Sequence, residues 1–159
     1  MSNKISYRIV CNISTEVDRE VEKNTYEQTV HIRYLCKVGE NAHKFEIESD
    51  KIKYLLSPRL EKSTQFLRST VFAYDWAQVV VTSWGKVIKV ANAEELQQRW
   101  NKLSTKLSDE YSGDYIDLRL NKITKELSVK DRAWDCFSKY FFFRPSNASS
   151  VISCSQFPI

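Results

Sequence analysis

The sequence has little of the residue types on which several common functions depend. Its 159 residues include 3 glycines, 3 prolines and 2 histidines. Because Gly39, Gly85 and Gly113 stand alone, the glycine-rich loops that cradle nucleotide phosphates cannot form. His31 and His43 are not accompanied by a CxxC or HxxxH motif, so no metal site is indicated. With so few glycines and prolines, long disordered linkers are also not expected.

Long apolar runs and blocks of one charge are missing as well. No run of apolar residues is long enough for a transmembrane helix, and the first residues, MSNKISYRIV, lack the apolar core of a signal peptide. The net charge of +4 at pH 7 is spread along the chain without a basic tail, which is weak support for nucleic-acid binding. We therefore expect a cytoplasmic protein.

The cysteines are expected to be free thiols in that compartment. There are four, at Cys11, Cys36, Cys136 and Cys154, and they lie far apart in the sequence. Reducing conditions disfavour disulfides. Cys11, Cys36 and Cys136 fall on apolar stripes, so we expect them to pack in the core as small hydrophobic residues.

The strongest local signals lie in residues 79–100, VVVTSWGKVIKVANAEELQQRW. Valines at 79–81 and β-branched residues at 87–90 favour two short strands. Gly85 between them can supply the positive φ of a hairpin turn. Asn92 is a favoured N-cap residue, and Glu95, three residues on, completes a capping box. The stretch therefore predicts a β-hairpin that leads directly into a helix.

Apolar residues at helical spacing predict that this helix pairs with a second one. The two stripes are Leu96, Trp100, Leu103, Leu107 and Tyr111, and then Ile116, Leu120, Ile123 and Leu127. Between them the pattern breaks at Ser112-Gly113-Asp114, where Asp114 can cap the second helix. Two stripes joined by a short break are typical of an αα-hairpin. A third helix is expected through Trp134 and Phe141, and a short helix at 59–68.

The first half of the chain alternates apolar and polar residues. Alternation over residues 5–13, 25–38 and 43–49 predicts strands with one apolar and one wet face, and residues 70–82 return to a β pattern. In the second of these the apolar side is formed by Tyr26, Val30, Ile32, Tyr34, Cys36 and Val38. Strands with one wet face indicate an antiparallel meander.

The sequence therefore predicts a single α+β domain over residues 1–159. Residues 1–90 would form the sheet, residues 93–143 the helices, and residues 149–157 a terminal strand. We expect an antiparallel β-sheet of about five to seven strands, packed on one face by about two or three C-terminal amphipathic helices. The apolar end of the sequence leaves two possibilities: the terminal strand docks into the sheet, or the chain is a fragment of a longer one.

Candidate reactive groups all have a simpler explanation. Cys36 or Cys11 with His43 could form a nucleophile pair, but no glycine-rich elbow accompanies them. Glu46 and Glu48 share the wet face of a strand and could serve acid/base chemistry, yet carboxylates there usually only solvate a sheet. We therefore assign no catalytic, cofactor-binding or metal-binding residues and expect no enzyme. A cleft joining His31 or His43 to a thiol or carboxylate would favour one.

The tryptophans could stack nucleic-acid bases, but most lie on core stripes. The aromatic candidates are Trp76, Trp84, Trp100 and Trp134, with Arg68, Lys86 and Arg99 near them in sequence. Trp84, at the predicted hairpin tip beside Lys86, is the one we expect to be exposed. A single tryptophan at a tip is more typical of a protein contact than of a base platform.

The stretch VVVTSWGKVIKVANAEELQQRWNKL resembles uncharacterised α+β proteins of Bacteroidota. The resemblance covers roughly residues 71–127: an apolar strand, a glycine turn, a short β run, an asparagine, an acid pair and a tryptophan-bearing helix. Some of those proteins are encoded near contractile-injection or toxin-delivery genes. The resemblance implies a role beside such systems and brings no catalytic residues.

The expected function is that of a non-enzymatic protein-binding module of a bacterial cytoplasm, as an adaptor, chaperone or immunity-type protein. Its partner would be another protein, or itself in a homodimer, contacted through Trp84 and Lys86. No cofactor, nucleic acid or membrane is expected to bind. Two alternatives stay open: a structural component of a larger secretion or phage-tail-like assembly, and a carrier of a small apolar ligand.

Overall fold

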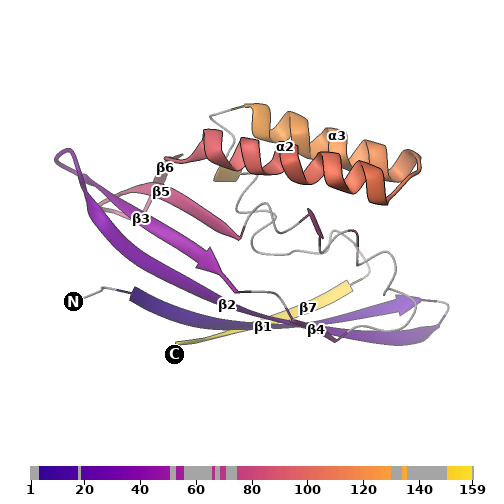
Figure 1. Ribbon diagram of the computed structural model, residues 1–159. Helices are drawn as coiled ribbons and strands as arrows, with labels where there is room; N and C mark the ends of the chain where they lie inside the picture. Colours follow the sequence, from indigo (N-terminus) through magenta and orange to yellow (C-terminus); the bar gives the residue numbers. More distant parts are fainter. Residues whose placement is uncertain are drawn as a thin grey trace.

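The structure, a computed structural model, joins a strongly curved sheet to a pair of helices that lie over one of its faces (Figure 1). It describes residues 4–17, 19–50, 53–55, 66, 69–70, 75–129, 134–135 and 150–158. The elements in chain order are β1 (Lys4–Val17), β2 (Glu20–Val38), β3 (Ala42–Ser49), β4 (Lys53–Leu55), β5 (Trp76–Thr82), β6 (Val87–Val90), α2 (Ala93–Glu110), α3 (Asp114–Ser128) and β7 (Ser150–Pro158). The predicted α+β class is confirmed.

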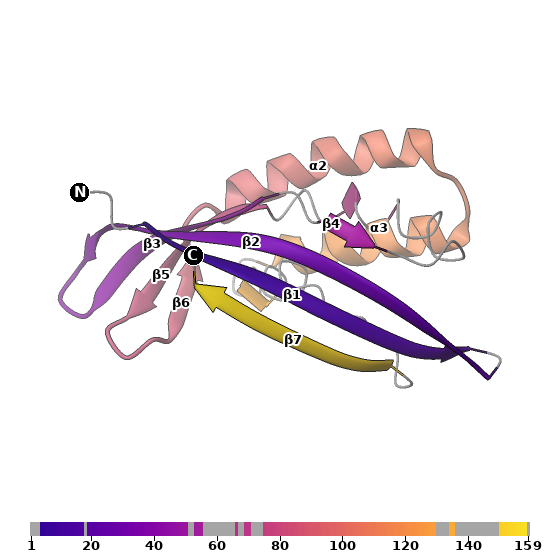
Figure 2. The same ribbon diagram turned by 90° about the horizontal axis from the view of Figure 1, so that it is seen from below.

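The sheet is antiparallel and is built around one long hairpin. Among the described residues it has seven strands: six follow the order β6-β5-β3-β2-β1-β7, and the seventh, β4, pairs with β2 beyond the end of β3. β1 and β2 pair from Lys4↔Arg33 to Val17↔Glu20, so the polar stretch after residue 13 extends both strands. β7 pairs with β1 along its outer side, as Figure 2 shows. The predicted terminal strand therefore docks into the sheet.

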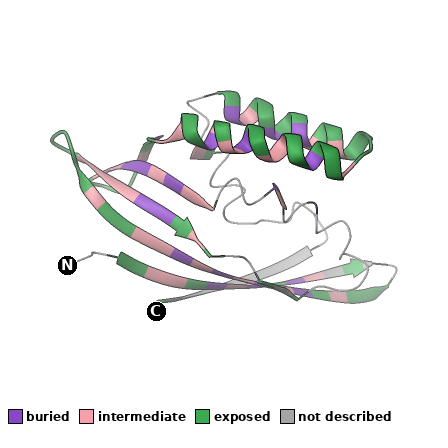
Figure 3. Ribbon diagram, viewed as in Figure 1, coloured by how far each residue is buried: buried purple, intermediate pink, exposed green. Residues whose placement is uncertain are grey.

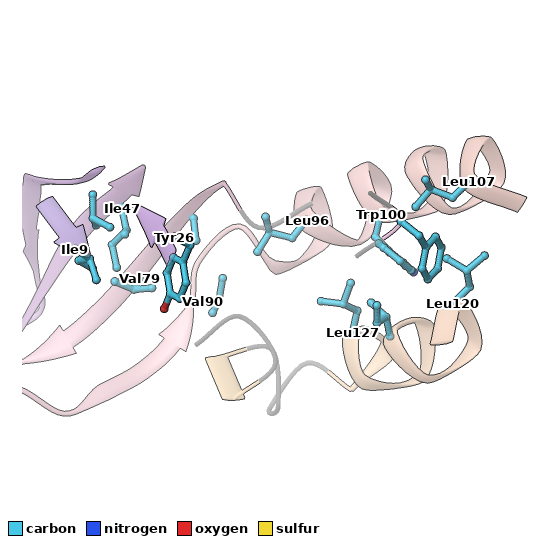
Figure 4. Close-up of a cluster of buried hydrophobic side chains, with 14 of the residues drawn as sticks. Ile9, Tyr26, Ile47, Val79, Val90, Leu96, Trp100, Leu107, Leu120 and Leu127 are labelled. Carbon is cyan, nitrogen blue, oxygen red and sulfur yellow. The ribbon is translucent and has the colours of Figure 1, made fainter. Parts of the chain in front are cut away.

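Strand alternation sorts side chains onto an apolar face and a polar face. The apolar face carries Ile9, Cys11, Tyr26, Val30, Ile47 and Val79, and these belong to the same buried cluster as Leu96, Trp100, Leu107, Leu120, Ile123 and Leu127 of the helices. Figure 4 labels members of both groups, among them Ile9, Tyr26, Ile47 and Val79 of the strands and Leu96, Trp100, Leu107, Leu120 and Leu127 of the helices. The helices and the sheet thus share one core, as the apolar stripes predict. The face on the other side of the sheet is free to carry charge.

The two helical stripes are confirmed. Buried positions recur among exposed ones along α2 and α3 (Figure 3), and Trp100 lies between the helices, where its Nε1 donates a hydrogen bond to Thr124 Oγ1 at 2.9 Å. That bond satisfies the polar atom that burial of a tryptophan would otherwise leave without a partner. None of the helices in the described part of the chain has the length and apolarity needed to cross a bilayer.

The N-cap position predicted at Asn92 is confirmed, but the predicted side-chain capping bonds are wrong at both helices. Asn92 occupies the N-cap position of α2, but its Oδ1 accepts a hydrogen bond from the backbone N–H of Gln78 at 2.8 Å and none from the helix. The side chain therefore fastens the helix start to β5. At α3 the cap is Gly113, with φ 127°, and Asp114 is the first helical residue. Asp114 still adds negative charge to the first turn, which the helix dipole favours.

The prediction that Cys36 packs in the core is also wrong. The β2–β3 register shifts between Tyr34 and Cys36, so one extra residue stands in β2. Such a bulge reverses the facing of every residue beyond it. Cys36 now pairs with Lys44 on the polar face, where it is an exposed free thiol, and Val38 moves to that face with it.

Cys11 is not a free thiol, contrary to expectation. It is 1% exposed on the apolar face, and it is disulfide-bonded. Its Cα partner in the β1–β7 register is Cys154. Cys136, Arg68, most of the helix expected at 59–68 and most of the third expected helix lie outside the described residues. Phe66, Ser69, Thr70, Trp134 and Asp135 are helical.

We expect Trp100→Ala to destabilise the protein by about 3–5 kcal/mol, because it removes a fully buried ring and leaves Thr124 without its donor. Trp84→Ala is the matched control, since that ring is exposed, and should change stability by less than about 0.5 kcal/mol. Chemical denaturation followed by circular dichroism measures both. If both variants lose the same free energy of unfolding, the burial of Trp100 between the helices is contradicted.

Peptide mapping by mass spectrometry without reductant should find Cys11 in a disulfide, and the strand register makes Cys154 the expected partner. Reduction should lower the free energy of unfolding by about 2–4 kcal/mol, since a link between distant parts of the chain restricts the unfolded state. Cys36→Ser is the control and should leave that difference unchanged. Recovery of Cys11 as an alkylated thiol from the unreduced protein would contradict the prediction.

Candidate functional site

A polar pocket lies on the face of the sheet that the helices do not cover. Two rows of side chains cross the strands there: Lys4, Arg33, Glu46 and Gln78 in one, and Ser6, His31, Glu48 and Trp76 in the next. Lys4, His31, Arg33, Glu46 and Glu48 line a hollow of about 260 Å³. Reactive groups therefore do converge, and His31 shares a cleft with two carboxylates.

Glu46 is the buried anion at the centre of this pocket. It is 6% exposed, although a solvated carboxylate was expected there. Arg33 donates to Oε1 through Nε at 3.0 Å and also through Nη2, and Gln78 Nε2 lies 3.5 Å from Oε2. Burial alone would raise the pKa of Glu46, but hydrogen bonds from Arg33, Trp76 and Gln78 and the charge of Arg33 hold it below its ordinary value. The carboxylate is thus ionised and already paired within the chain.

His31 stands between a hydroxyl and a carboxylate. Ser6 Oγ lies 2.7 Å from Nδ1, and Asp50 Oδ2 lies 3.4 Å from Nε2. A serine, a histidine and an aspartate in series have the composition of a hydrolytic triad. However, Ser6 lies within a regular β ladder and not on the sharp turn that exposes a nucleophile, and the Asp50 side chain is 64% exposed. We interpret the series as a cross-strand polar contact.

The other thiol–imidazole pairings that the sequence offers do not form. Cys11 is buried in a disulfide, so it cannot act as a nucleophile. Cys36 and His43 lie on opposite faces of the sheet after the bulge in β2, because Cys36 is level with Lys44 and His43 with Lys37. His43 instead packs near Tyr34, with ring centroids 5.9 Å apart.

A second candidate site lies where two hairpins end side by side. The β2–β3 and β5–β6 turns meet at one end of the sheet (Figure 2), and the backbone N–H of Ser83 donates to Asn41 O at 3.0 Å. The second turn is closed by the Gly85 N–H to Thr82 O bond of 2.9 Å, and Gly85 has a φ of 87° that glycine adopts at no steric cost. Trp84 occupies the turn itself and is 73% exposed.

The hairpin-end surface, as we name residues 36–44 and 82–89, combines apolar and basic side chains. Trp84, Ile88 at 56% exposure and Val38 at 38% exposure are its exposed apolar residues. Its basic residues are Lys37, Lys44, Lys86 and Lys89. Sequence reasoning identified Trp84 and Lys86. It missed Val38, because the bulge in β2 cannot be read from the alternating pattern, and it missed Lys44 and Lys89, which only strand pairing brings together.

The tryptophans do not form a series of exposed rings. Trp100 is buried between the helices, and Trp76 is half-buried on the polar face, where Arg99 lies 6.0 Å from its ring centroid. Arg99 is itself held by Asp75, at 2.5 Å between Nη2 and Oδ1. Arg99 therefore already contacts the Trp76 ring and Asp75 within the chain.

Comparison with known proteins gives no relative: no family model, no curated protein and no solved structure matches this chain. The similarity to Bacteroidota proteins stays an expectation.

Glu46→Gln should lower the free energy of unfolding by about 1–2 kcal/mol at neutral pH, because it replaces a buried, paired carboxylate by an amide. The folded-state pKa of Glu46 is lowered, so its stabilisation is complete above the ordinary carboxyl pKa and is lost as pH falls through the folded pKa. The gap between wild type and Glu46→Gln should therefore shrink on acidification. Urea titrations across the acid range measure it.

Glu48→Gln serves as the control on the same strand, since Glu48 is exposed. We expect it to change stability by less than about 0.5 kcal/mol at any pH. A gap between wild type and Glu46→Gln that is independent of pH would contradict the ion-pair argument.

Proposed function

We propose that the protein is a non-enzymatic binding module that contacts another protein through the hairpin-end surface. The observation that carries this proposal is the exposure of Trp84, 73%, at the tip of a hydrogen-bonded turn. An adaptor, chaperone or immunity-type role is compatible with such a module. The identity of the partner would distinguish these roles.

The position of Trp84 suits an interface anchor for two physical reasons. A tryptophan has two side-chain torsions and a large ring, so it contributes much contact area at small entropic cost. The turn is held by the Gly85 and Lys86 backbone N–H groups, which donate to Thr82 O at 2.9 Å and to Thr82 Oγ1 at 3.0 Å. A partner would therefore bind the Trp84 ring on a backbone that is already ordered before binding. Exposed aliphatic residues and lysines lie on the same hairpin-end surface, which agrees with the apolar centre and polar surroundings of many interfaces.

The polar pocket supports binding less well than the hairpin end, and catalysis poorly. A general acid or base works best with a pKa near the working pH, whereas the pKa of Glu46 is lowered by its partners. Charged lining residues also do not favour the apolar ligand that a carrier would enclose. The cleft that joins His31 to Glu46 and Glu48 is the arrangement that would favour an enzyme, but Glu46 is already paired with Arg33. We therefore prefer the binding module to an enzyme or an apolar carrier, because of the exposed Trp84.

The disulfide at Cys11 bears on where the protein acts. Structural disulfides persist in oxidising compartments and are rare in the reducing cytosol. Since Cys11 is disulfide-bonded and buried, we propose an oxidising compartment in place of the cytoplasm expected from the sequence.

Photo-crosslinking tests whether a partner binds specifically at the hairpin-end surface or whether the protein binds other proteins unspecifically. A benzophenone amino acid placed at Trp84 should crosslink a defined partner in cells of the source organism, to be identified by mass spectrometry. Tyr115 is the matched control, because it is an exposed aromatic, at 62%, on α3. The same partner crosslinked equally from both positions, or from neither, would contradict the proposal.

With the purified partner, Trp84→Ala should weaken the affinity by at least about 30-fold, as expected for an aromatic hot spot. Tyr115→Ala and His31→Ala should leave the affinity within about twofold of wild type, since neither residue belongs to the hairpin-end surface. Isothermal titration calorimetry measures all three. A larger loss in His31→Ala than in Trp84→Ala would move the binding site to the polar pocket.

A further inference from the structure

The fold gathers most of the net positive charge of the chain at one end of the sheet. The hairpin-end surface holds four lysines, Lys37, Lys44, Lys86 and Lys89, and one acid, Glu40. Lys37, which is level with His43, lies on the opposite face of the ladder from Lys44. Four minus one leaves a net charge of +3 there, out of +4 for all 159 residues. The charge is not visible as a run in the sequence, because its two halves lie about forty positions apart and meet only through the pairing of β3 with β5.

The pairing register places two of these lysines in one row. Lys44 is level with Val80, and Val80 with Lys89, so a single valine separates them across three strands. Neighbouring strands lie about 4.8 Å apart, which puts the two backbones about 10 Å from each other. Val80 is buried although it lies on the polar face, which is consistent with aliphatic stems of lysines covering it.

The lysines at this end are not neutralised by the protein itself. Within the described ranges, none of the four forms an ion pair, whereas the arginines Arg8, Arg33 and Arg99 are all paired with carboxylates. Unpaired cations around an exposed ring leave a positive field for a partner to complement.

We propose that the partner of the hairpin-end surface is an acidic polypeptide that accepts Trp84 in an apolar recess and places carboxylates against Lys44, Lys86 and Lys89. This inference rests on the proposed function and adds the charge of the partner to it. Charge complementarity would accelerate encounter and set orientation, and the ring would supply most of the affinity.

Two other occupants fit the surface less well. A second copy in a two-fold dimer would bring a net +3 against another +3, because such an interface uses the same patch on both copies. A nucleic acid would match the charge, but phosphate and base recognition favours arginine and a series of stacking rings. This surface has no arginine, and it surrounds one exposed tryptophan with the aliphatic residues Val38 and Ile88.

A panel of defined probes tests the proposal by fluorescence polarisation. The probes are short peptides in which glutamate and aspartate alternate with leucine and phenylalanine, the same peptides with glutamine in place of every acid, and a single-stranded oligothymidylate. Acidic peptides should bind, glutamine peptides should bind at least about tenfold more weakly, and raising NaCl from about 50 to about 500 mM should weaken acidic-peptide binding at least about tenfold.

Charge reversal at the surface completes the test. Lys44→Glu with Lys89→Glu should reduce the affinity for acidic peptides at least about tenfold, and Lys86→Glu alone provides a second variant should the double one fail to fold. The control is Lys102→Glu with Lys122→Glu, which reverses two exposed lysines on α2 and α3 and keeps the same total charge. That control should bind as wild type does, apart from a small loss through the change in total charge.

Each outcome separates this inference from the proposed function. If glutamine peptides bind as tightly as acidic ones, and Trp84→Ala weakens the affinity for both, the inference that the partner is acidic is overturned. The proposal of a protein-binding module would then still stand. Oligothymidylate bound more tightly than any peptide would overturn the inference in favour of nucleic acid. Acidic peptides that do not bind, or that bind the lysine variants unchanged, would also overturn it. The protein-binding proposal itself is decided by crosslinking at position 84.

Discussion

The backbone ladder of β2 is the constraint on which the rest of the structure depends. β2 pairs with β1 from Glu20 to Arg33 on one side and with β3 and β4 on the other, so its register fixes three neighbours at once. Because side chains alternate along a strand, that register sends Tyr26 and Val30 into the core and His31 and Arg33 to the opposite face. The helices lie over the first face (Figure 1). The pocket forms on the second.

Local periodicity was sufficient to predict most of this architecture. The alternating strands, the helical stripes ending at Tyr111 and Leu127, and the terminal strand all depend on patterns within a short window, and they are present. The exception is the start of the strand expected at 70–82, because Thr70 is helical and β5 begins at Trp76. The failures come from interactions over longer range. A bulge adds one residue to β2 and turns Cys36 outward, and Asn92 binds β5 in place of its own helix. The disulfide of Cys11 is a covalent link that the local pattern around Cys11 does not reveal.

The same contrast between local patterns and contacts over longer range applies to the candidate sites. Trp84 was identifiable because a glycine turn between two β-branched runs exposes its central residue whatever the rest of the chain does. The lysine row and the contact between Ser6 and His31 were not, since each joins segments that the sequence separates widely. Glu46 shows a further limit: alternation assigns it correctly to the polar face, but its burial comes with neighbours on other strands, Arg33, Trp76 and Gln78.

The bulge in β2 has a practical consequence. It places the thiol of Cys36 outside the core, level with Lys44 and within the hairpin-end surface, while Cys11 is held in its disulfide. A thiol-reactive fluorophore would therefore attach beside the expected contact region without altering Trp84 or the turn that carries it. Binding of a partner at this surface would then change the intensity or the emission wavelength of the dye.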